Sequence, residues 1–151
     1  MFDLFSIIYF TPFYFPNGKS SPKNKYFIPI HEDSNGKIIF AYLPTSQDYV
    51  PDKYLNHGCI EVKTENISCY LFAKDRIITD RGFSFPFNTF VYAYQMNEFS
   101  KEIMESVYEN ENVDYEVIGR LTKKERDSFI KCLINSPSVK RKIKKILADI
   151  N

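Results

Sequence analysis

Residues 39–47 read Ile-Phe-Ala-Tyr-Leu-Pro-Thr-Ser-Gln, an apolar run that changes to polar residues at its end. Five apolar residues run to Leu43, and Pro44 then ends the run before three polar side chains. A short apolar run that stops at a proline is typical of a buried strand, because proline cannot donate a hydrogen bond to a sheet. The stretch therefore predicts a strand whose end presents Thr45, Ser46 and Gln47.

The residues around this stretch predict a meander of short strands. Turn-forming segments, such as the polar loop at 16–25 and Ser-Asn-Gly at 34–36, separate runs rich in Ile, Val, Phe and Tyr. The predicted strands cover residues 5–15 (interrupted at Pro12), 26–30, 37–43, 59–62, 68–73, 90–94 and 115–118, with Gly119 ending the last. We expect no helix before residue 97, which favours a small antiparallel barrel or a coiled sheet.

Three helices are predicted late in the chain. Ser100 can cap a short first helix, and Thr122 with Glu125 forms a capping box that starts the second. Ser136-Pro137 is a start signal for a third helix, at 137–150, with apolar residues along one side. The sequence thus predicts an α+β protein that is mainly β with C-terminal helices.

Composition limits the possible classes of protein. The chain has 151 residues, 44% hydrophobic and 26% charged, which is typical of one soluble domain. Its 14 Phe and 11 Tyr suit pleated, half-buried surfaces and so favour sheet. No apolar run is long enough to span a membrane, and we interpret the opening residues as a strand rather than a signal peptide. We expect a cytoplasmic protein without a membrane partner.

The cysteines and the charges give further expectations. Three cysteines, at 59, 69 and 132, are too few and too scattered for a disulfide framework, and their spacing indicates no structural metal. We therefore expect reduced thiols and no cofactor. The net charge of +1 implies no acidic partner, but residues 98–116 are acidic and the helix at 137–150 is basic.

Four stretches together resemble the MazF/PemK (Kid-like) toxin family. The first strand, polar loop and Asn-Lys-Tyr-Phe-Ile-Pro-Ile at 24–30 resemble the opening of that family, and residues 39–47 resemble its third strand. Residues 67–80 resemble its strand that runs into an acidic-Gln-x-Arg-Thr segment, and residues 117–133 resemble its closing strand and helix. The resemblance covers residues 5–80 and 113–133, and leaves 81–112 as an insert in a single domain.

The resemblance implies a fold and an activity. Members have an SH3-like, strongly bent antiparallel barrel, are usually homodimers, and include metal-independent endoribonucleases that a partner antitoxin neutralises. By position, the catalytic residues would be Lys25, Thr45, Ser46 and Asp75. The RNA-binding residues would be Lys19, Lys23, Gln47, Arg76 and Thr79. The family has an arginine at the position of Lys25 and a second arginine at the position of Ile78, so both positions depart from the family pattern.

Each of these residues also has a simpler interpretation. Thr45 and Ser46 can close a turn through hydrogen bonds to the local backbone, and the loop lysines can form a solvated surface. His31 and His57, the only histidines, show no partner in the sequence. Three hypotheses follow: an endoribonuclease that cleaves single-stranded RNA, a non-catalytic module that binds RNA or a peptide in the same groove, and a relative of the toxins that an RNA antitoxin neutralises.

Overall fold

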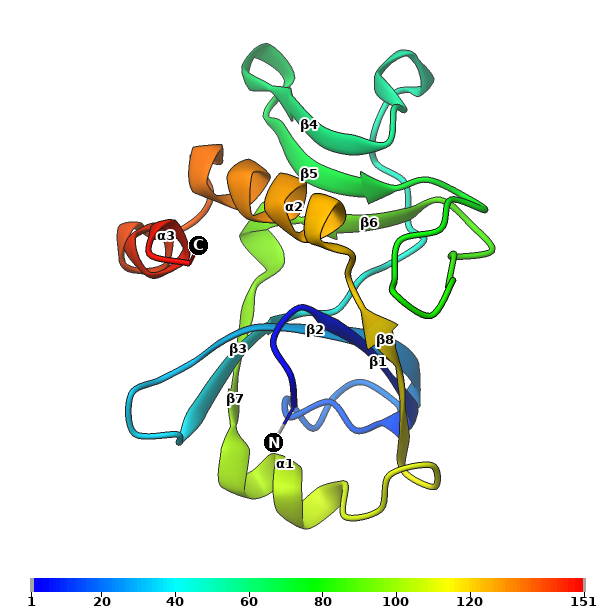
Figure 1. Ribbon diagram of the computed structural model, residues 1–151, viewed down its shortest axis with the longest axis vertical. Helices are drawn as coiled ribbons and strands as arrows, with labels where there is room; N and C mark the ends of the chain where they lie inside the picture. The colour runs from blue at the N-terminus through cyan, green and yellow to red at the C-terminus, as the bar shows by residue number, and fades with distance from the viewer. Residues whose placement is uncertain (1, 151) are drawn as a thin grey trace.

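A computed structural model describes residues 2–150, and its strands lie in two antiparallel sheets with three α-helices (Figure 1). The only helical turns that it shows in residues 2–96 are short 3-10 turns at Asp52–Tyr54, Lys63–Glu65 and Ala93–Gln95. In the view of Figure 1 the smaller sheet lies above the larger one, and α2 crosses the smaller sheet. The structure confirms a mainly β protein with C-terminal helices. The strands of residues 2–150 do not close into one barrel.

The larger sheet contains the strands predicted around the opening stretch. β1 (Ser6–Phe13), β2 (Lys23–Glu32) and β3 (Ile38–Tyr42) are neighbours in it and pair antiparallel, as predicted. β7 (Asn97–Ser100) and β8 (Tyr115–Arg120) complete the order β7-β3-β2-β1-β8. The register shifts in three of these pairings, and such irregularities bend and twist a strand.

The smaller sheet has the order β4-β5-β6. Its strands are β4 (Gly58–Val62), β5 (Ile67–Phe72) and β6 (Thr89–Tyr92), close to the predicted positions. Two isolated bridges join this half of the molecule to the larger sheet: Thr45 pairs with Phe90, and Thr79 pairs with Leu121. The chain therefore passes from β3 directly to the edge of the smaller sheet.

The helices begin where their capping residues predict, with one exception. Ser100 caps α1 (Lys101–Val107), and Thr122 caps α2 (Lys123–Asn135) by accepting a hydrogen bond from the Glu125 amide. The third helix was predicted to start at Ser136-Pro137, and this is wrong: α3 (Arg141–Ala148) starts four residues later. Ser136 is buried and its hydroxyl bonds to Ser68 of β5 at 2.6 Å, so the expected cap holds a turn against the smaller sheet instead.

One prediction about a strand is also corrected. Gly119 does not end the last strand but lies inside β8. A Cβ at this position would lie 3.1 Å from the side chain of Thr79, so glycine allows the Thr79 segment to approach β8 closely. The predicted insert at 81–112 supplies β6, β7 and α1, and therefore contributes a strand to each sheet. β7 was not predicted, because Asn-Glu-Phe-Ser has no strand pattern of its own.

The main core lies between the two sheets and under α2. Phe129 of α2 is fully buried and its ring contacts four aromatic rings, those of Phe5, Tyr42, Tyr70 and Phe72, at centroid distances of 5.2 to 6.3 Å. Phe5 and Tyr42 belong to the larger half and Tyr70 and Phe72 to the smaller sheet, so this one side chain joins both. Phe129 and Leu133 of α2 both belong to this core, and α2 lies against β4 and β5 of the smaller sheet.

The cysteines differ from the prediction. Cys59 of β4 and Cys132 of α2 form a disulfide, with 5.4 Å between their Cα atoms, and Cys69 is a buried free thiol. The sequence did not indicate this pair because 73 residues separate its members. The disulfide fastens α2 to the edge strand of the smaller sheet. In residues 2–150, none of the helices is long and apolar enough to cross a membrane.

Candidate functional site

The first candidate site is a surface pocket that contains three of the predicted residues. Lys25, Thr45 and Gln47 line a cavity of about 370 Å³ together with Phe15, Leu43, and residues 94–97. Lys25 enters from β2, and the other two come from the segment that follows β3. The structure therefore brings together a cation from β2 and a hydroxyl and an amide from the segment that follows β3.

The Lys25 ammonium is held at the end of β3. Its Nζ donates to the carbonyl oxygen of Pro44 at 3.4 Å, directly before Thr45. Burial, and secondarily the neighbouring charge of Lys23, lowers the pKa of Lys25 from its usual value. A lysine with a lowered pKa gives up its proton more readily than a solvated one. Lys25 can thus offer either a positive charge or a proton to a ligand in the pocket.

Thr45 has both a structural and a possible chemical role. Its backbone pairs with Phe90 in both directions, at 3.0 and 2.7 Å, and its hydroxyl oxygen accepts from the Gln47 amide at 3.1 Å. The simpler interpretation, a turn closed by the threonine hydroxyl, is therefore correct. Because the oxygen is the acceptor in that bond, the hydroxyl proton is still available to a ligand.

Tyrosine rings continue this surface. Tyr49 and Tyr94 are 64% and 62% exposed, whereas Tyr92 between them is buried. The Tyr92 hydroxyl donates to the Gln47 carbonyl at 2.7 Å and accepts from the Tyr49 amide at 3.0 Å, and burial raises its pKa to about 12. Tyr94 also lines a second cavity of about 370 Å³ with Tyr49. The Thr45–Gln47 segment is thus fixed beside two exposed aromatic faces.

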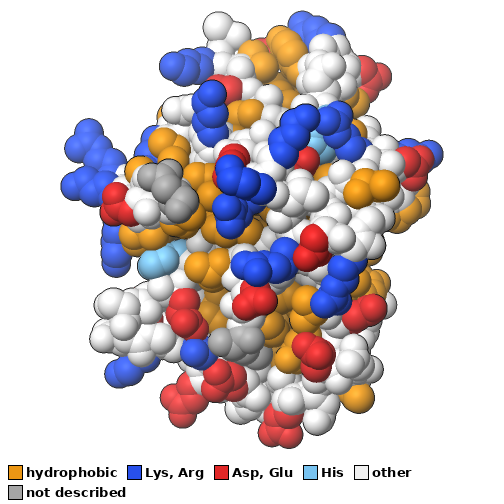
Figure 2. Space-filling model, in the orientation of Figure 1, with side chains coloured by type: hydrophobic (Ala, Val, Ile, Leu, Met, Phe, Trp, Pro, Cys, Tyr) orange, Lys and Arg blue, Asp and Glu red, His pale blue; other side chains and the backbone are white. Residues whose placement is uncertain are grey.

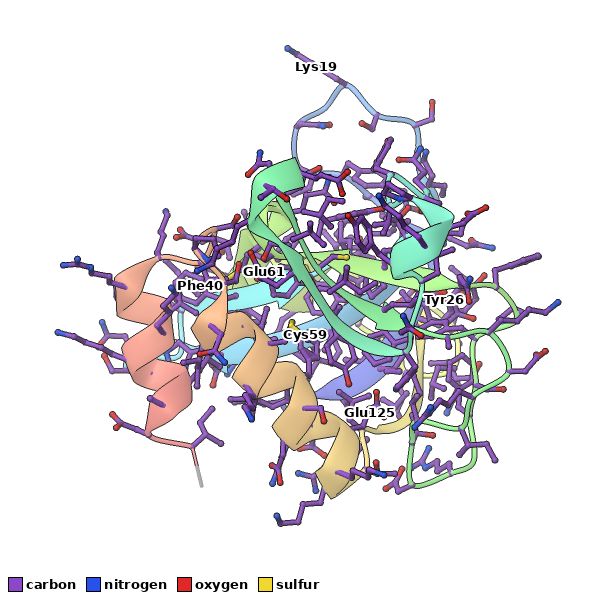
Figure 3. All side chains as sticks on the ribbon, turned by 90° about the horizontal axis from the view of Figure 1, so that it is seen from above. Lys19, Tyr26, Phe40, Cys59, Glu61 and Glu125 are labelled. Atoms are coloured by element: carbon purple, nitrogen blue, oxygen red, sulfur yellow. A yellow bond between two sulfur atoms is a disulfide. The ribbon has the colours of Figure 1, made fainter. Side chains whose placement is uncertain are left out.

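The remaining predicted residues lie elsewhere. Ser46 is exposed and does not line the pocket. Lys19 projects from the tip of the first loop, away from the body of the protein (Figure 3). Lys23 lies nearer, with its Nζ 6.0 Å from the centroid of the Phe15 ring, which lines the pocket. The loop therefore brings Lys23, but not Lys19, toward Lys25.

The 75–79 segment does not reach the Lys25 pocket. Asp75 is exposed in a turn with φ of 63°, and Arg76 lines a different cavity. Thr79 is 2% exposed, and its hydroxyl oxygen accepts from the Phe83 amide at 3.0 Å. Ile78, at the position where the family pattern has arginine, is fully buried in the main core. In this chain the segment is structural apart from its exposed turn.

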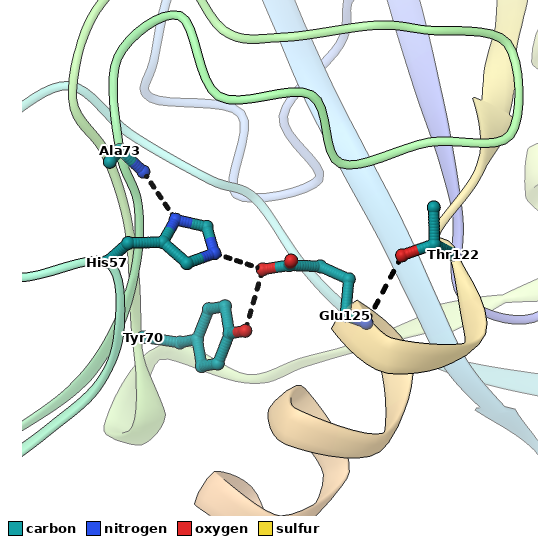
Figure 4. Close-up of polar contacts among 5 residues, drawn as sticks. All are labelled: His57, Tyr70, Ala73, Thr122 and Glu125. Atoms are coloured by element: carbon teal, nitrogen blue, oxygen red, sulfur yellow. Dashed lines mark hydrogen bonds and ion pairs between the residues drawn. The ribbon is translucent and has the colours of Figure 1, made fainter.

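A second cluster, which the sequence did not indicate, lies between β5 and α2 (Figure 4). Glu125 Oε1 accepts from Tyr70 Oη at 2.7 Å and lies 2.6 Å from His57 Nε2. His57 Nδ1 accepts from the Ala73 amide at 3.1 Å. Since Nδ1 accepts, Nε2 carries the proton in the neutral ring and donates it to Glu125. Both ring nitrogens are therefore engaged within the protein.

The pKa values in this cluster follow from its burial. Burial lowers the pKa of His57, with the Glu125 carboxylate acting in the opposite direction and Arg76 in the same direction. Burial and the bond to Glu125 raise the pKa of Tyr70. Only the capping box marked Glu125 in the sequence, and nothing there linked it to His57, 68 residues earlier.

The surroundings of the second cluster form a cavity of about 420 Å³. One wall is the outward stripe of α2, which carries Lys124, Ser128, Lys131 and Asn135 at helical spacing. Both cysteines of the disulfide also line it. Among residues 2–150, no group of three His, Cys, Asp or Glu side chains is arranged so that it could hold a metal ion.

Comparison with known proteins gives no family for this chain. No protein-family model matches the sequence, and no curated protein matches it either.

Proposed function

We propose that this protein is a toxin-like endoribonuclease that binds single-stranded RNA at the Lys25 pocket and cleaves it without a metal ion. The observation that carries this proposal is the meeting of Lys25, Thr45 and Gln47 in one pocket beside exposed tyrosine rings. The resemblance to the MazF/PemK family supplies the reaction, and the two bridges between the sheets are compatible with a distorted relative of its SH3-like barrel.

The proposed reaction is attack of a ribose 2′-hydroxyl on the adjacent phosphodiester. The 2′-hydroxyl loses its proton to water as it attacks and forms a 2′,3′-cyclic phosphate, and the bond to the 5′-oxygen of the next nucleotide breaks, so that this oxygen leaves and takes up a proton. Negative charge grows on the phosphate oxygens in the transition state, and donors placed there stabilise it by several kcal/mol in related chemistries, about 3 kcal/mol for one donor. We assign Lys25 and the Thr45 hydroxyl as these donors, with Lys25 also able to protonate the leaving oxygen.

The tyrosines would bind the bases. Stacking of a base on an aromatic side chain is worth about 1–3 kcal/mol and tolerates any sequence. Tyr94 borders the Lys25 pocket and Tyr49 lies next along the same surface, so a strand with its phosphate at Lys25 can place neighbouring bases on these rings. This arrangement favours unpaired RNA, because paired bases do not expose their faces.

A second function, RNA binding without cleavage, is favoured by one observation. The residues that line the Lys25 pocket include no histidine or carboxylate, so none of them is an ordinary general base for the 2′-hydroxyl. The same surface would then be a binding module, or the site of a toxin neutralised by an RNA antitoxin rather than a protein one.

The decisive experiment incubates the purified protein with single-stranded RNA in excess chelator. We expect products that end in a cyclic phosphate, and no cleavage of an oligonucleotide with 2′-deoxyribose throughout. Lys25→Ala should abolish cleavage, whereas Lys74→Ala, an exposed lysine outside the pocket, should leave it unchanged. If the unaltered protein binds RNA without cleaving it, the binding-module hypothesis replaces the enzyme hypothesis. If Lys25→Ala still binds and cleaves RNA normally, the Lys25 pocket is not the site.

We also propose a homodimer. The larger sheet ends at β7 and β8, and exposed sheet edges commonly pair with a second chain. Light scattering at tens of micromolar protein should give twice the mass of 17.8 kDa, and a monomer mass would reject the dimer.

A further inference from the structure

The Cys59–Cys132 disulfide forms part of the wall of the 420 Å³ cavity beside α2, and its two halves differ in accessibility. Cys59 is exposed on β4, the edge strand of the smaller sheet, whereas Cys132 is 5% exposed on the inner side of α2. Figure 3 labels Cys59 next to the α2 ribbon. Cys59 is therefore the more accessible residue of the pair.

Positive charge surrounds this opening. Arg76, Lys124 and Lys131 line the cavity, and Glu125 is the one carboxylate among the lining residues. Glu125 is buried and hydrogen-bonded to Tyr70 and His57, and with three cations against this one carboxylate the lining keeps a formal net charge of +2 when His57 is neutral. In Figure 2, Lys and Arg side chains gather over α2 on the face that carries this cavity. An anion is thus attracted to the region of the exposed cysteine.

We propose that Cys59–Cys132 is a thiol-exchange site that low-molecular-weight anionic thiols, such as glutathione, open through Cys59. The incoming thiolate attacks Cys59 Sγ and forms a mixed disulfide, while the electron pair of the broken S–S bond passes to Cys132 Sγ, which takes a proton from water. A second thiolate then attacks the mixed disulfide at the sulfur of the first thiol. The balance is two thiols oxidised to one small disulfide and one protein disulfide reduced to two thiols.

The buried half of the disulfide is prepared for the reduced state. Cys132 Sγ lies 3.5 Å from the carbonyl oxygen of Cys69, so the thiol formed on reduction has an acceptor for its proton. Cys59 would become a thiol on an exposed residue of the cavity that Lys131 and Arg76 also line. Cys69 does not compete, because it is buried and burial raises its pKa to about 12.

The test measures the rate of disulfide opening in the native protein by three thiols of equal length but different charge. These are 2-mercaptoethanesulfonate (negative), 2-mercaptoethanol (neutral) and cysteamine (positive), with each rate expressed per thiolate. We expect the negative thiol to react about tenfold faster than the neutral one at low salt, and the positive one to be slowest. The three rates should converge in 1 M salt.

Two lysine variants distinguish the effect of charge in the cavity from the effect of charge elsewhere on the surface. Lys131→Gln should slow the negative thiol and leave the neutral one unchanged, whereas Lys145→Gln, on α3 and outside the cavity, should change neither rate. Equal rates for the three thiols, or a disulfide that reacts only after the protein unfolds, would overturn the proposal.

The point of attack is tested with single-cysteine variants and a dianionic aromatic disulfide, 5,5′-dithiobis(2-nitrobenzoate). Cys132→Ser leaves the Cys59 thiol at the cavity and should release the coloured thiolate rapidly. Cys59→Ser leaves only buried thiols and should react at least tenfold more slowly. The reverse order would overturn the assignment to Cys59. Since these variants lack the disulfide, mass spectrometry of the unaltered protein, with the first thiol found on the Cys59 peptide, checks the assignment independently.

Discussion

At the scale of single residues, polar groups with partners that are distant in sequence hold α2 on the smaller sheet. Glu125 is buried on α2, and Tyr70 and His57 of the smaller half stabilise its carboxylate. A hydrogen bond to a charged buried group is worth about 1.5–3 kcal/mol, so these contacts help to hold α2 on the sheet. His57 serves this purpose as a neutral ring, because its Nδ1 accepts from the Ala73 amide.

The state of His57 makes stability depend on pH. Burial lowers the pKa of His57 in the folded protein, so below its unfolded value of about 6.5 the unfolded chain binds more protons. The free energy of unfolding should therefore fall as the pH drops from about 6.5 toward the folded pKa, and the contribution of His57 should level off below it. Arg76 and Lys124 act in the same direction as burial, and Glu125 opposes it.

Denaturant unfolding between pH 7.5 and 5 measures this effect. The pKa of His31 is also lowered by burial, so the comparison is between the unaltered protein and His57→Gln, which removes one of the two contributions. We expect a shallower pH dependence in the variant. A pH dependence identical to that of the unaltered protein would contradict the assignment to His57.

At the scale of elements, α2 is the part that joins the molecule together. It begins at the Thr122 cap, packs on the main core through Phe129, and is linked to β4 by the disulfide. The link closes a long loop, because 73 residues separate Cys59 from Cys132. In the chain-entropy description, a cross-link of this span stabilises the folded state by about 4 kcal/mol.

Removal of this link should lower stability without removing the fold. We expect the reduced protein, and Cys132→Ala, to lose on the order of 2–4 kcal/mol of unfolding free energy relative to the oxidised protein. Equilibrium unfolding in oxidising and reducing buffers measures this loss, and equal stabilities with and without the disulfide would contradict the prediction.

The cap of α2 makes a smaller contribution. Thr122→Ala should lose about 1 kcal/mol of unfolding free energy, because the Glu125 amide then lacks its capping oxygen, while Thr122→Ser should retain most of the stability. Equilibrium unfolding of the two variants measures the difference.

At the scale of the whole molecule, two sheets share one core. Phe129 contacts rings from both halves, and the bridges at Thr45 and Thr79 connect the same halves through the backbone. The Lys25 pocket lies where the first of these bridges begins, so its geometry depends on how the halves are joined.

Truncation of the central ring should affect both halves together. We expect Phe129→Ala to cost about 3–5 kcal/mol through lost burial and the cavity that it leaves. Ile103→Ala on α1, where the side chain is 62% exposed, should stay within about 0.5 kcal/mol. Hydrogen exchange in Phe129→Ala should rise in β1–β3 and in β4–β6 alike, whereas a rise confined to one sheet would mean that the halves are stabilised separately.

The sequence by itself determined the local structure. Apolar periodicity predicts the strands around residues 39–47 and the inward side of α2. Side chains that bond to the nearby backbone predict the caps at Ser100 and Thr122. Both signals depend only on residues that are neighbours in the sequence. The family resemblance put Lys25, Thr45 and Ser46 in one site; Lys25 and Thr45 line one pocket, and Ser46 does not.

The tertiary structure alone decided what depends on distant contacts. Contacts between segments that are far apart in the chain form the Cys59–Cys132 link and the His57–Glu125–Tyr70 cluster. Such contacts also decide the division into two sheets, the late start of α3 and the continuation of β8 through Gly119. Ser136 shows the reason: its local pattern is that of a helix cap, and its hydroxyl oxygen does accept from the Ser138 amide, but the hydroxyl is also buried against Ser68 of β5 and α3 begins later. A polar group bonds where folding leaves it out of water, and sequence neighbours do not determine that place.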